Sequence, residues 1–190
     1  GAGCRAGRVR AQPGYGRTAM AHVPRPRAER SAAQRDRTLH RNFQGYTLQG
    51  DADLLGFGMS SISQLGNFYG QNYKSIQRWQ ETVSAGGLPL ERGFVLSRDD
   101  EIRRDLIMTL LCDMDVDWPS FGRRWQIDPR SYFAEELGQL AQFERDGLLT
   151  STDAALRLSG SGRLVVRVIA MSFDRYLSGR GGVNRFSRIL

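Results

Sequence analysis

The stretch "HRNFQGYTLQGDADLLGFGMSSIS", residues 40–63, combines four glycines with aliphatic and aromatic residues and shows no helical period. Within it, residues 46–48 and 53–57 predict two short buried strands. Glycine is favoured where the backbone bends or where another group approaches it closely. The stretch therefore predicts short strands joined where the backbone bends or approaches another group closely.

The size of the chain fits a globular protein of one or two domains, because 190 residues can bury a substantial core. Its apolar runs are far shorter than the roughly 20 residues of a membrane-spanning helix, so we expect no membrane partner. Cys4 and Cys112 are the two cysteines. Two cysteines so far apart exclude a disulfide framework and predict a reducing compartment, the cytoplasm.

Positive charge is concentrated at the start of the chain. Residues 1–41 carry ten arginines against two acidic residues, a net charge of +8, whereas the other 149 residues carry 17 basic and 18 acidic residues, a net charge of −1. Residues 1–38 show no helix or strand period, which predicts a disordered or divergent basic segment. Its functional alternatives are a basic arm for nucleic acid and a transit peptide. Because the chain begins with Gly1 rather than methionine, we expect a fragment of a longer protein.

Helical patterns dominate residues 71–190. A first helix is expected over residues 71–83, with one face formed by Ile76, Trp79 and Val83. The strongest helix signal follows at residues 98–112, where Ser97 can cap the N-terminus and three acidic residues occupy the first turn. This helix carries an apolar stripe of Ile102, Leu106 and Leu110, widened by Ile107 and Leu111.

Three further helices and a hairpin complete the predicted elements. Pro119 opens a short helix through Trp125, and Asp128 can cap the next, whose core-facing residues are Tyr132, Phe133, Leu137, Leu140 and Phe143. Residues 148–159 predict a β-hairpin with its turn at residues 152–153. The last helix, residues 164–177, carries the apolar residues Val165, Val168, Ile169, Phe173 and Tyr176.

Helices followed by a hairpin and a final helix are the order of a winged-helix module, which enters DNA with the helix before the wing. Here that helix, residues 128–146, carries five acidic and two basic residues. A net charge of −3 is repelled by phosphates, so we expect no nucleic-acid partner. A helical packing or lid module is the favoured interpretation, and a non-catalytic winged-helix binding module with a basic N-terminal arm is the alternative.

The sequence shows no catalytic set of its own. His22 and His40 are the two histidines, and no nucleophile elbow accompanies them. Two cysteines cannot complete a four-cysteine zinc site or hold an iron–sulfur cluster alone. The run "GFGMSS", residues 56–61, is more often a tightly packed strand end than a cofactor cradle. We therefore assign no catalytic residue and no metal ligand.

A resemblance to a known family rests on four segments, residues 40–63, "SRDDEIRRDLIMTLLC" at 97–112, "YFAEELGQL" at 132–140 and the closing "FSRIL" at 186–190. Together they resemble the C-terminal part of the oxygen-independent coproporphyrinogen III oxidases, from about Gln34 to Leu190. These are radical S-adenosylmethionine (SAM) enzymes of haem biosynthesis, also called coproporphyrinogen dehydrogenases. The most specific run is His-Arg-Asn-Phe-Gln-Gly-Tyr.

The resemblance implies an α/β parent fold, an incomplete (β/α) barrel. Residues 39–70 would close its end, and residues 71–190 would form a mostly helical C-terminal domain with a small winged-helix-like hairpin, a lid over the porphyrinogen. The backbone of the closing strands would lie against SAM, which would account for the glycines. The family uses two SAM molecules, and we expect this protein to be a monomer.

The resemblance also implies site residues. By motif match, Ile62 falls where the family contacts the second SAM, and Phe43 and Gln44 fall where it lines the same pocket. Without the resemblance, Ile62 would be interpreted as a core aliphatic residue. Phe43 could equally be a wall residue that contacts no ligand.

The implied reaction is the oxidative decarboxylation of two propionate side chains of coproporphyrinogen III to vinyl groups, which gives protoporphyrinogen IX. A 5′-deoxyadenosyl radical abstracts a hydrogen from the propionate, and an electron acceptor completes the step. The family's C-x-x-x-C-x-x-C motif, whose three thiolates hold a [4Fe–4S] cluster, is absent here, and its Met-Asp-His-Phe strand end is replaced by residues 20–23, "MAHV". The sequence thus predicts a C-terminal portion of an oxidoreductase that lacks the cluster ligands and is inactive alone.

Overall fold

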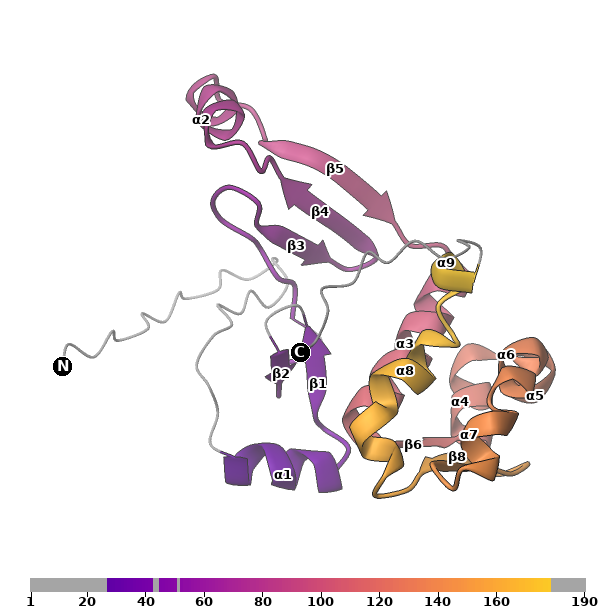
Figure 1. Cartoon of the computed structure of the whole chain (residues 1–190). Coiled ribbons are helices and arrows are strands. Elements are labelled where there is room, and N and C mark those ends of the chain that lie inside the picture. The colour runs from indigo at the N-terminus through magenta and orange to yellow at the C-terminus, as the bar shows by residue number, and fades with distance from the viewer. Residues whose placement is uncertain (1–26, 43–44, 51, 179–190) are drawn as a thin grey trace.

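The structure, a computed structural model, describes residues 27–42, 45–50 and 52–178. Its elements form two groups, which are joined by the connection from β5 to α3 (Figure 1). The first group comprises α1 (Arg27–Arg35), β1 (His40–Asn42), β2 (Gly45–Thr47), β3 (Ile62–Leu65), β4 (Phe68–Asn72), α2 (Ile76–Ser84) and β5 (Leu90–Val95). Its strands form two antiparallel sheets, β1–β2 and β3–β4–β5, and neither closes into a barrel within the described residues.

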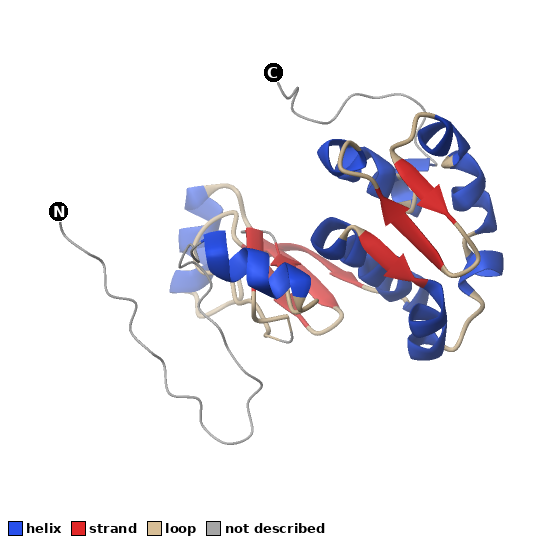
Figure 2. Cartoon of the chain, turned by 90° about the horizontal axis from the view of Figure 1, so that it is seen from below, coloured by secondary structure: helices blue, strands red, loops and turns tan. Residues whose placement is uncertain are grey.

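The second group is mainly helical. It comprises α3 (Arg98–Asp113), β6 (Asp115–Asp117), α4 (Trp118–Trp125), α5 (Pro129–Tyr132), α6 (Ala134–Gln139), α7 (Ala141–Arg145), β7 (Leu149–Ser151), β8 (Ala155–Leu158), the 3₁₀ helix η1 (Gly162–Val165), α8 (Val166–Met171) and α9 (Arg175–Ser178). Figure 2 shows helices surrounding the three strands of this group, whose order is β6–β8–β7. These strands give the helices a second layer to pack against.

The core of the second group confirms the apolar periods of the sequence. Ile102, Leu106 and Leu110 of α3 are at most 1% exposed. They pack with aromatic and aliphatic residues of the later elements, namely Trp118, Phe121, Phe133, Leu140, Leu149, Leu156, Ile169 and Phe173. The predicted core residues Tyr132, Leu137 and Phe143 are partly buried against this cluster. Burial of one continuous apolar cluster is the main source of stability in this part of the chain.

Local signals were confirmed at three places. Ser97 accepts a hydrogen bond from the Asp100 backbone, and the Asp100 carboxylate accepts one from the Ser97 backbone, which forms a capping box. Asp128 caps α5 through the backbone of Arg130. The predicted hairpin is present as the antiparallel pair β7–β8. Each of these signals depends on residues a few positions apart, so the local sequence suffices to specify them.

The prediction of one last helix over residues 164–177 was wrong. The segment forms three short elements, η1, α8 and α9. Ile169 and Phe173 are fully buried as expected, but Val168 and Tyr176 are each 51% exposed. The breaks turn successive short helices to different faces, so one 3.6-residue period does not hold along the segment. The helix capped by Asp128 is divided in the same way, into α5, α6 and α7.

The predictions for the glycine-rich stretch were partly wrong. The strand expected at residues 46–48 is present as β2, but Tyr46 is 41% exposed. The strand expected at residues 53–57 is reduced to a bridge between Leu54 and Gln64. Beyond Leu54 the chain leaves the sheet, and Phe57 is 81% exposed. The apolar residues beyond Leu54 are therefore exposed on the surface of the described chain and do not form a buried strand.

The helix predicted over residues 71–83 begins later than expected. Residues 71 and 72 belong to β4, and Ser75 caps α2 by accepting a hydrogen bond from the Arg78 backbone. No residue of α2 is buried, and Ile76 is 57% exposed. The sequence of α2 therefore has an apolar face, but within the described residues this face packs against no core.

Helix α1 lies within the basic segment for which no regular structure was predicted. Ala33 is 5% exposed and packs with Leu39 and Cys112. The Gln34 side chain donates a hydrogen bond of 2.7 Å to the Cys112 carbonyl, which stabilises the attachment of α1 to the end of α3. Because its contacts with α3 lie about 80 positions away in the chain, the local pattern could not reveal this helix.

Candidate functional site

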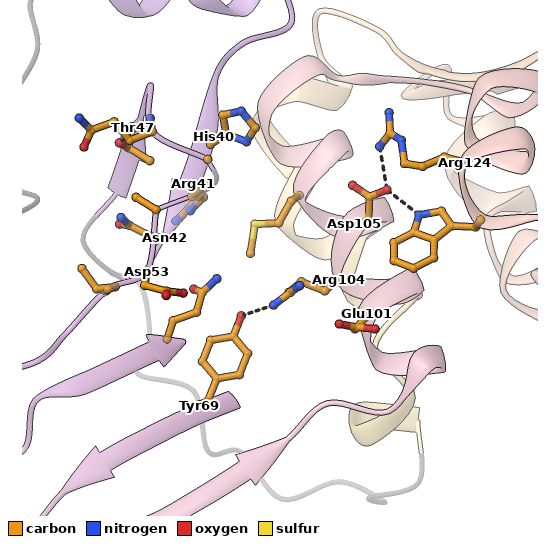
Figure 3. Close-up of a pocket in the computed structure, with 17 residues that line it drawn as sticks. His40, Arg41, Asn42, Thr47, Asp53, Tyr69, Glu101, Arg104, Asp105 and Arg124 are labelled. Atoms are coloured by element: carbon orange, nitrogen blue, oxygen red, sulfur yellow. Dashed lines mark hydrogen bonds and ion pairs between the residues drawn. The ribbon is translucent and has the colours of Figure 1, made fainter. Parts of the chain in front are cut away.

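A cleft of about 470 Å³ opens between the two groups of elements. One wall is formed by β1 and the segment leading to β3, with His40, Arg41, Asn42 and Asp53 (Figure 3). The other wall is formed by α3 and the end of α4, with Glu101, Arg104, Asp105 and Arg124. Tyr69 of β4 lies at the bottom of the view between the two walls. Residues from four separate stretches of sequence thus share one concave surface.

The loop before β3 is fixed by hydrogen bonds to the sheet. Asn72 of β4 is 8% exposed, and its side-chain amide donates to the Gly58 carbonyl at 2.9 Å and to the Ser61 hydroxyl at 3.0 Å. The Ser61 hydroxyl donates to the same Gly58 carbonyl at 2.7 Å. A buried amide with two partners satisfies its polar group and orders the loop. The loop therefore presents β3 in one fixed position.

Two glycines of this loop are required by the fold itself. Gly58 has a φ of +93°, in a region that side chains rarely adopt. A Cβ atom at Gly56 would lie 2.7 Å from the Ile62 carbonyl oxygen. The close neighbour of the Gly56 backbone is thus the chain's own strand. We expected a ligand to account for these glycines, but the backbone conformation accounts for Gly58 and intramolecular packing accounts for Gly56.

One face of the β3–β4–β5 sheet carries the side chains that matter for the site. Ile62 pairs with Gln71, and Tyr69 pairs with Phe94 across the strands. Because side chains alternate along a strand, Ile62, Tyr69 and Phe94 share one face. The Tyr69 hydroxyl accepts a hydrogen bond from Arg104 at 3.4 Å, and the Phe94 ring contacts the Tyr176 ring edge-on at 5.9 Å between centroids. This face is therefore turned toward α3 and α9.

A second, shallower hollow of about 330 Å³ lies on that face and is lined by Ile62, Tyr69, Gln71, Arg92 and Phe94 with the backbone of two glycines. Tyr69 lines both this hollow and the larger cleft. Ile62 is half-buried and belongs to neither the core of the second group nor the smaller clusters. The structure therefore places Ile62 in the wall of a hollow, and its role there stays a prediction.

The other two predicted site residues, Phe43 and Gln44, lie outside the described residues. Their neighbour Asn42 lines the large cleft. Of the two histidines, His40 also lines this cleft and His22 lies outside the described residues. No triad forms around His40 from the contacts of the described chain.

The charged groups of the cleft were missed by sequence reasoning, because no motif or spacing marks them. Arg124 and the Trp125 ring nitrogen both donate to Asp105, at 2.8 and 2.7 Å. Arg104 makes two long hydrogen bonds of 3.4 Å, to the Gly66 carbonyl and to the Tyr69 hydroxyl. The Arg41 guanidinium lies 5.2 Å from the centre of the Tyr46 ring. The sequence could have indicated them only through the His-Arg-Asn run and the α3 segment, because both are among the segments that carry the family resemblance.

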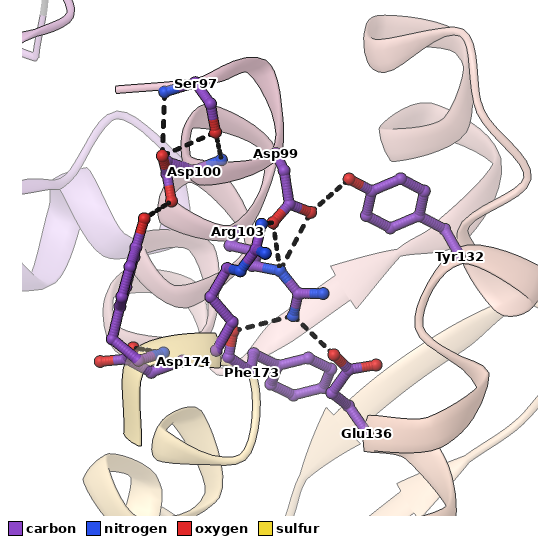
Figure 4. A network of polar contacts seen from close by, with 10 residues as sticks. Ser97, Asp99, Asp100, Arg103, Tyr132, Glu136, Phe173 and Asp174 are labelled. Carbon is purple, nitrogen blue, oxygen red and sulfur yellow. Dashed lines mark hydrogen bonds and ion pairs between the residues drawn. The ribbon is translucent and has the colours of Figure 1, made fainter. Parts of the chain in front are cut away.

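A separate polar network joins the start of α3 to later helices (Figure 4). The Asp99 carboxylate accepts hydrogen bonds from Arg103, from Arg175 and from the Tyr132 hydroxyl. Arg103 also donates to Glu136 at 2.6 Å and to the Phe173 carbonyl at 3.1 Å. Every charge in this network has a partner, so it is built to hold α3, α6 and α9 together rather than to bind a ligand.

The network also shifts the acidity of its members. Burial would raise the pKa of Asp99, but the hydrogen bonds from Tyr132, Arg175 and Arg103 outweigh it and lower the pKa below its ordinary value. Burial, together with the hydrogen bond to Asp99, raises the pKa of Tyr132 to about 12. Asp99 is therefore a firmly ionised acceptor at neutral pH, and Tyr132 is a neutral donor.

The described residues do not fit an iron–sulfur cluster. No group of three or more His, Cys, Asp or Glu side chains within the described chain is arranged to hold a metal ion. The single described cysteine, Cys112, is 3% exposed, and burial, with the nearby Asp113 charge, raises its thiol pKa to about 11. A thiol held in its neutral form is a poor metal ligand. None of the described helices is long and apolar enough to cross a membrane.

Comparison with known proteins shows what the chain is similar to. Residues 96–165 match the family model described as the HemN C-terminal domain. The oxygen-independent coproporphyrinogen III oxidase of Escherichia coli (strain K12) is 43% identical over 179 residues, which cover 94% of this chain and 39% of that protein. The protein of the same name from Pseudomonas aeruginosa is 42% identical over 95% of this chain and 39% of its own length. The chain therefore spans about two fifths of the length of these curated relatives.

A solved structure agrees with the sequence matches. It is described as "Coproporphyrinogen III oxidase (HemN) from Escherichia coli is a Radical SAM enzyme", and it superimposes with a TM-score of 0.77 at 45% identity over 80% of this chain and 35% of that one. Since the sequence match covers 94% of the chain, it extends into residues 1–38, beyond the start near Gln34 expected from the motifs. These findings confirm the resemblance: the chain is similar to the oxygen-independent coproporphyrinogen III oxidases over most of its length, and residues 96–165 match the HemN C-terminal domain.

Proposed function

We propose that this chain acts as the C-terminal portion of an enzyme that oxidatively decarboxylates coproporphyrinogen III to protoporphyrinogen IX in porphyrin and haem biosynthesis. The observation that carries the proposal is the 43% identity over 94% of the chain to a protein named for this activity. Coproporphyrinogen III and SAM as ligands, a monomeric state and a cytoplasmic location are parts of the same proposal.

The chain's own part in this function would be to shape the ligand site. We propose that residues 39–70 supply the end of the barrel and that residues 71–190 form the helical domain that covers the porphyrinogen. The large cleft between β1 and α3 supports this division, because its two walls come from these two segments. Concave surfaces between structural units are common ligand sites.

Ile62 is proposed to contact the second SAM, with Phe43 and Gln44 lining the same pocket. The support for Ile62 is its place in a hollow lined by two aromatic rings, those of Tyr69 and Phe94. Such a surface suits the flat adenine ring of SAM. The support for Phe43 and Gln44 is the motif match alone.

The [4Fe–4S] cluster, which would supply the radical chemistry, would have to be held by residues outside the described part of the chain. The described part of the chain offers one buried cysteine and no cluster of metal ligands. In the proposed enzyme, the cluster ligands would come from the portion of the relatives that this chain does not span.

A chimaera tests the proposed function. In it, residues 39–190 of this chain replace the matching segment of the E. coli relative, and turnover of coproporphyrinogen III is measured without oxygen. We expect protoporphyrinogen IX to form with the chimaera and not with the 190-residue chain alone. The unaltered E. coli protein is the positive control. A chimaera that folds and retains its cluster but forms no product would refute the proposal.

The winged-helix alternative has one observation in its favour, the antiparallel hairpin β7–β8. The helices before it still carry the net charge of −3 over residues 128–146. Titration of the purified chain with duplex DNA at moderate salt separates the two functions. We expect no binding, because phosphate contacts require basic side chains on the docking helix.

A further inference from the structure

The arginines of the described chain differ in how they are neutralised. Most are exposed, but four whose burial the structure describes are partly buried: Arg41, Arg103, Arg104 and Arg130. Arg103 pairs with Asp99 and Glu136, and Arg130 pairs with Asp153. Arg41 and Arg104 form no ion pair with any described residue. Both of these unpaired, partly buried arginines line the same cleft.

An unpaired guanidinium at such a position is informative. Removing a charge from water costs free energy unless a partner compensates it. The two hydrogen bonds of Arg104 are long, at 3.4 Å, and both are to neutral oxygens. The contact of Arg41 is with the Tyr46 ring rather than with an acid. Each arginine therefore keeps donors available for an acceptor that enters the cleft.

The acidic residues of the cleft do not remove this capacity. Asp105 is occupied by Arg124 and Trp125, and Asp53 accepts a hydrogen bond from the Gly66 backbone. Glu101 lies three positions before Arg104, on the same face of α3. Together the acidic and basic side chains that line the cleft leave its net charge close to zero. A neutral cleft does not attract anions by its net charge. Any recognition of an anion must therefore come from the placement of the two guanidinium groups.

We propose that Arg104, with Arg41 on the facing wall, binds a carboxylate of the ligand that occupies this cleft. Planar guanidinium groups form paired hydrogen bonds with carboxylates, so two of them on opposite walls suit a ligand with more than one carboxylate. This inference rests on the proposed function, in which coproporphyrinogen III brings several propionate groups. SAM carries a carboxylate as well, and the test below separates the two sources.

Tyr69 connects this contact to the predicted SAM hollow. Its hydroxyl accepts the hydrogen bond from Arg104, and its ring lines the hollow beside Ile62. A carboxylate held by Arg104 would thus fix the ligand directly next to that hollow. Tyr69 is a positioning residue in this arrangement, because it orients Arg104 and separates the two cavities.

The test uses the 190-residue chain with coproporphyrin III, the stable oxidised tetracarboxylate, and with its tetra-amide, which lacks the charges. Binding is followed by porphyrin absorbance and fluorescence, and SAM is titrated separately by calorimetry. The variants are Arg104→Gln, Arg41→Gln and Arg104→Lys. Arg78→Gln is the matched control, because Arg78 is an exposed arginine on α2 outside the cleft. Glu101→Gln is the control for a charge change within the cleft.

We expect the chain to bind the tetra-acid more tightly than the tetra-amide. Arg104→Gln should weaken binding of the tetra-acid about tenfold or more, the order expected for one charge-assisted hydrogen bond. It should leave binding of the tetra-amide unchanged. Arg104→Lys should recover part of the loss, since lysine keeps the charge without the paired geometry. Arg78→Gln should have no effect, and Glu101→Gln should not weaken binding.

The outcomes separate the inference from the function. If Arg104→Gln and Arg41→Gln bind coproporphyrin III as well as the unaltered chain does, the inference is overturned, while turnover by the chimaera still decides the function. If these variants lose SAM and keep coproporphyrin III, the carboxylate site stands with SAM as its source. If the unaltered chain binds neither molecule, the inference is wrong for this chain. Thermal unfolding of each variant confirms that the fold is retained.

Discussion

Replacing Ile62 by alanine separates a ligand contact from a packing residue. A buried isoleucine changed to alanine costs about 2–5 kcal/mol in the free energy of unfolding. Ile62 is only half-buried and lies outside the core clusters of the described chain. Because stabilisation scales with the apolar area removed from water, we expect a cost of about 1 kcal/mol. The main effect of Ile62→Ala should instead be weaker binding of SAM.

Ile169→Ala is the matched control, since Ile169 is fully buried in the core of the second group. We expect this variant to lose the full amount, about 2–5 kcal/mol. Stability is measured on the 190-residue chain by urea unfolding, followed by circular dichroism and by fluorescence.

The SAM measurement uses the chimaera with the E. coli relative. We expect Ile62→Ala to lower the amount of SAM bound per protein and the turnover, and to leave the cluster absorbance intact. If Ile62→Ala costs as much stability as Ile169→Ala while SAM binding is unchanged, Ile62 is a packing residue. The assignment taken from the resemblance would then be wrong.

Further predictions concern the polar network, the buried cores and Cys112. Asp99→Asn should lower the free energy of unfolding at pH 7 by about 1.5–3 kcal/mol, because it removes charge-assisted hydrogen bonds, whereas Asp146→Asn, at an exposed position, should have little effect. Since the folded-state pKa of Asp99 lies below its ordinary value, its contribution is complete above about pH 5 and is lost as the pH falls through the folded value, so the difference between Asp99→Asn and the unaltered chain should shrink in acid. Hydrogen exchange should be slowest in the buried turns of α3 and faster in α2, which has no buried residue; slow amides throughout α2 would show a covering contact beyond the described residues. Reconstitution of the chain with iron and sulfide should give no stoichiometric [4Fe–4S] cluster, and a cluster spectrum that survives desalting would contradict this expectation. Cys112 should react with iodoacetamide at pH 8 far more slowly in the folded chain than in urea, because burial raises the pKa of its thiol to about 11.

The family could be recognised from the sequence because its signals are linear. The His-Arg-Asn-Phe-Gln-Gly-Tyr run and the α3 segment are continuous stretches whose residues do not need the fold to be identified. The site could be indicated only in part. Ile62 was named by motif match, whereas the shared sheet face that brings it beside Tyr69 and Phe94 depends on strand register.

The helical half of the fold was largely determined by local sequence. The Ser97 capping box, the Asp128 cap and the β7–β8 hairpin use groups within a few residues of each other. The stripe on α3 is buried as its period predicted. Such features form wherever neighbouring residues satisfy one another, so the sequence alone suffices for them.

Tertiary structure decided the features whose partners are distant in the chain. Helix α1 is stabilised by contacts with the end of α3. The strands β4 and β5 bury few side chains. Neither feature therefore produces an apolar period in the sequence. The cleft is the clearest case. Arg41 and Arg104 are ordinary arginines in the sequence, and only the packing of β1 beside α3 places both in one partly buried cleft without an acidic partner among the described residues. Charge compensation depends on distances in space, which a linear sequence does not contain.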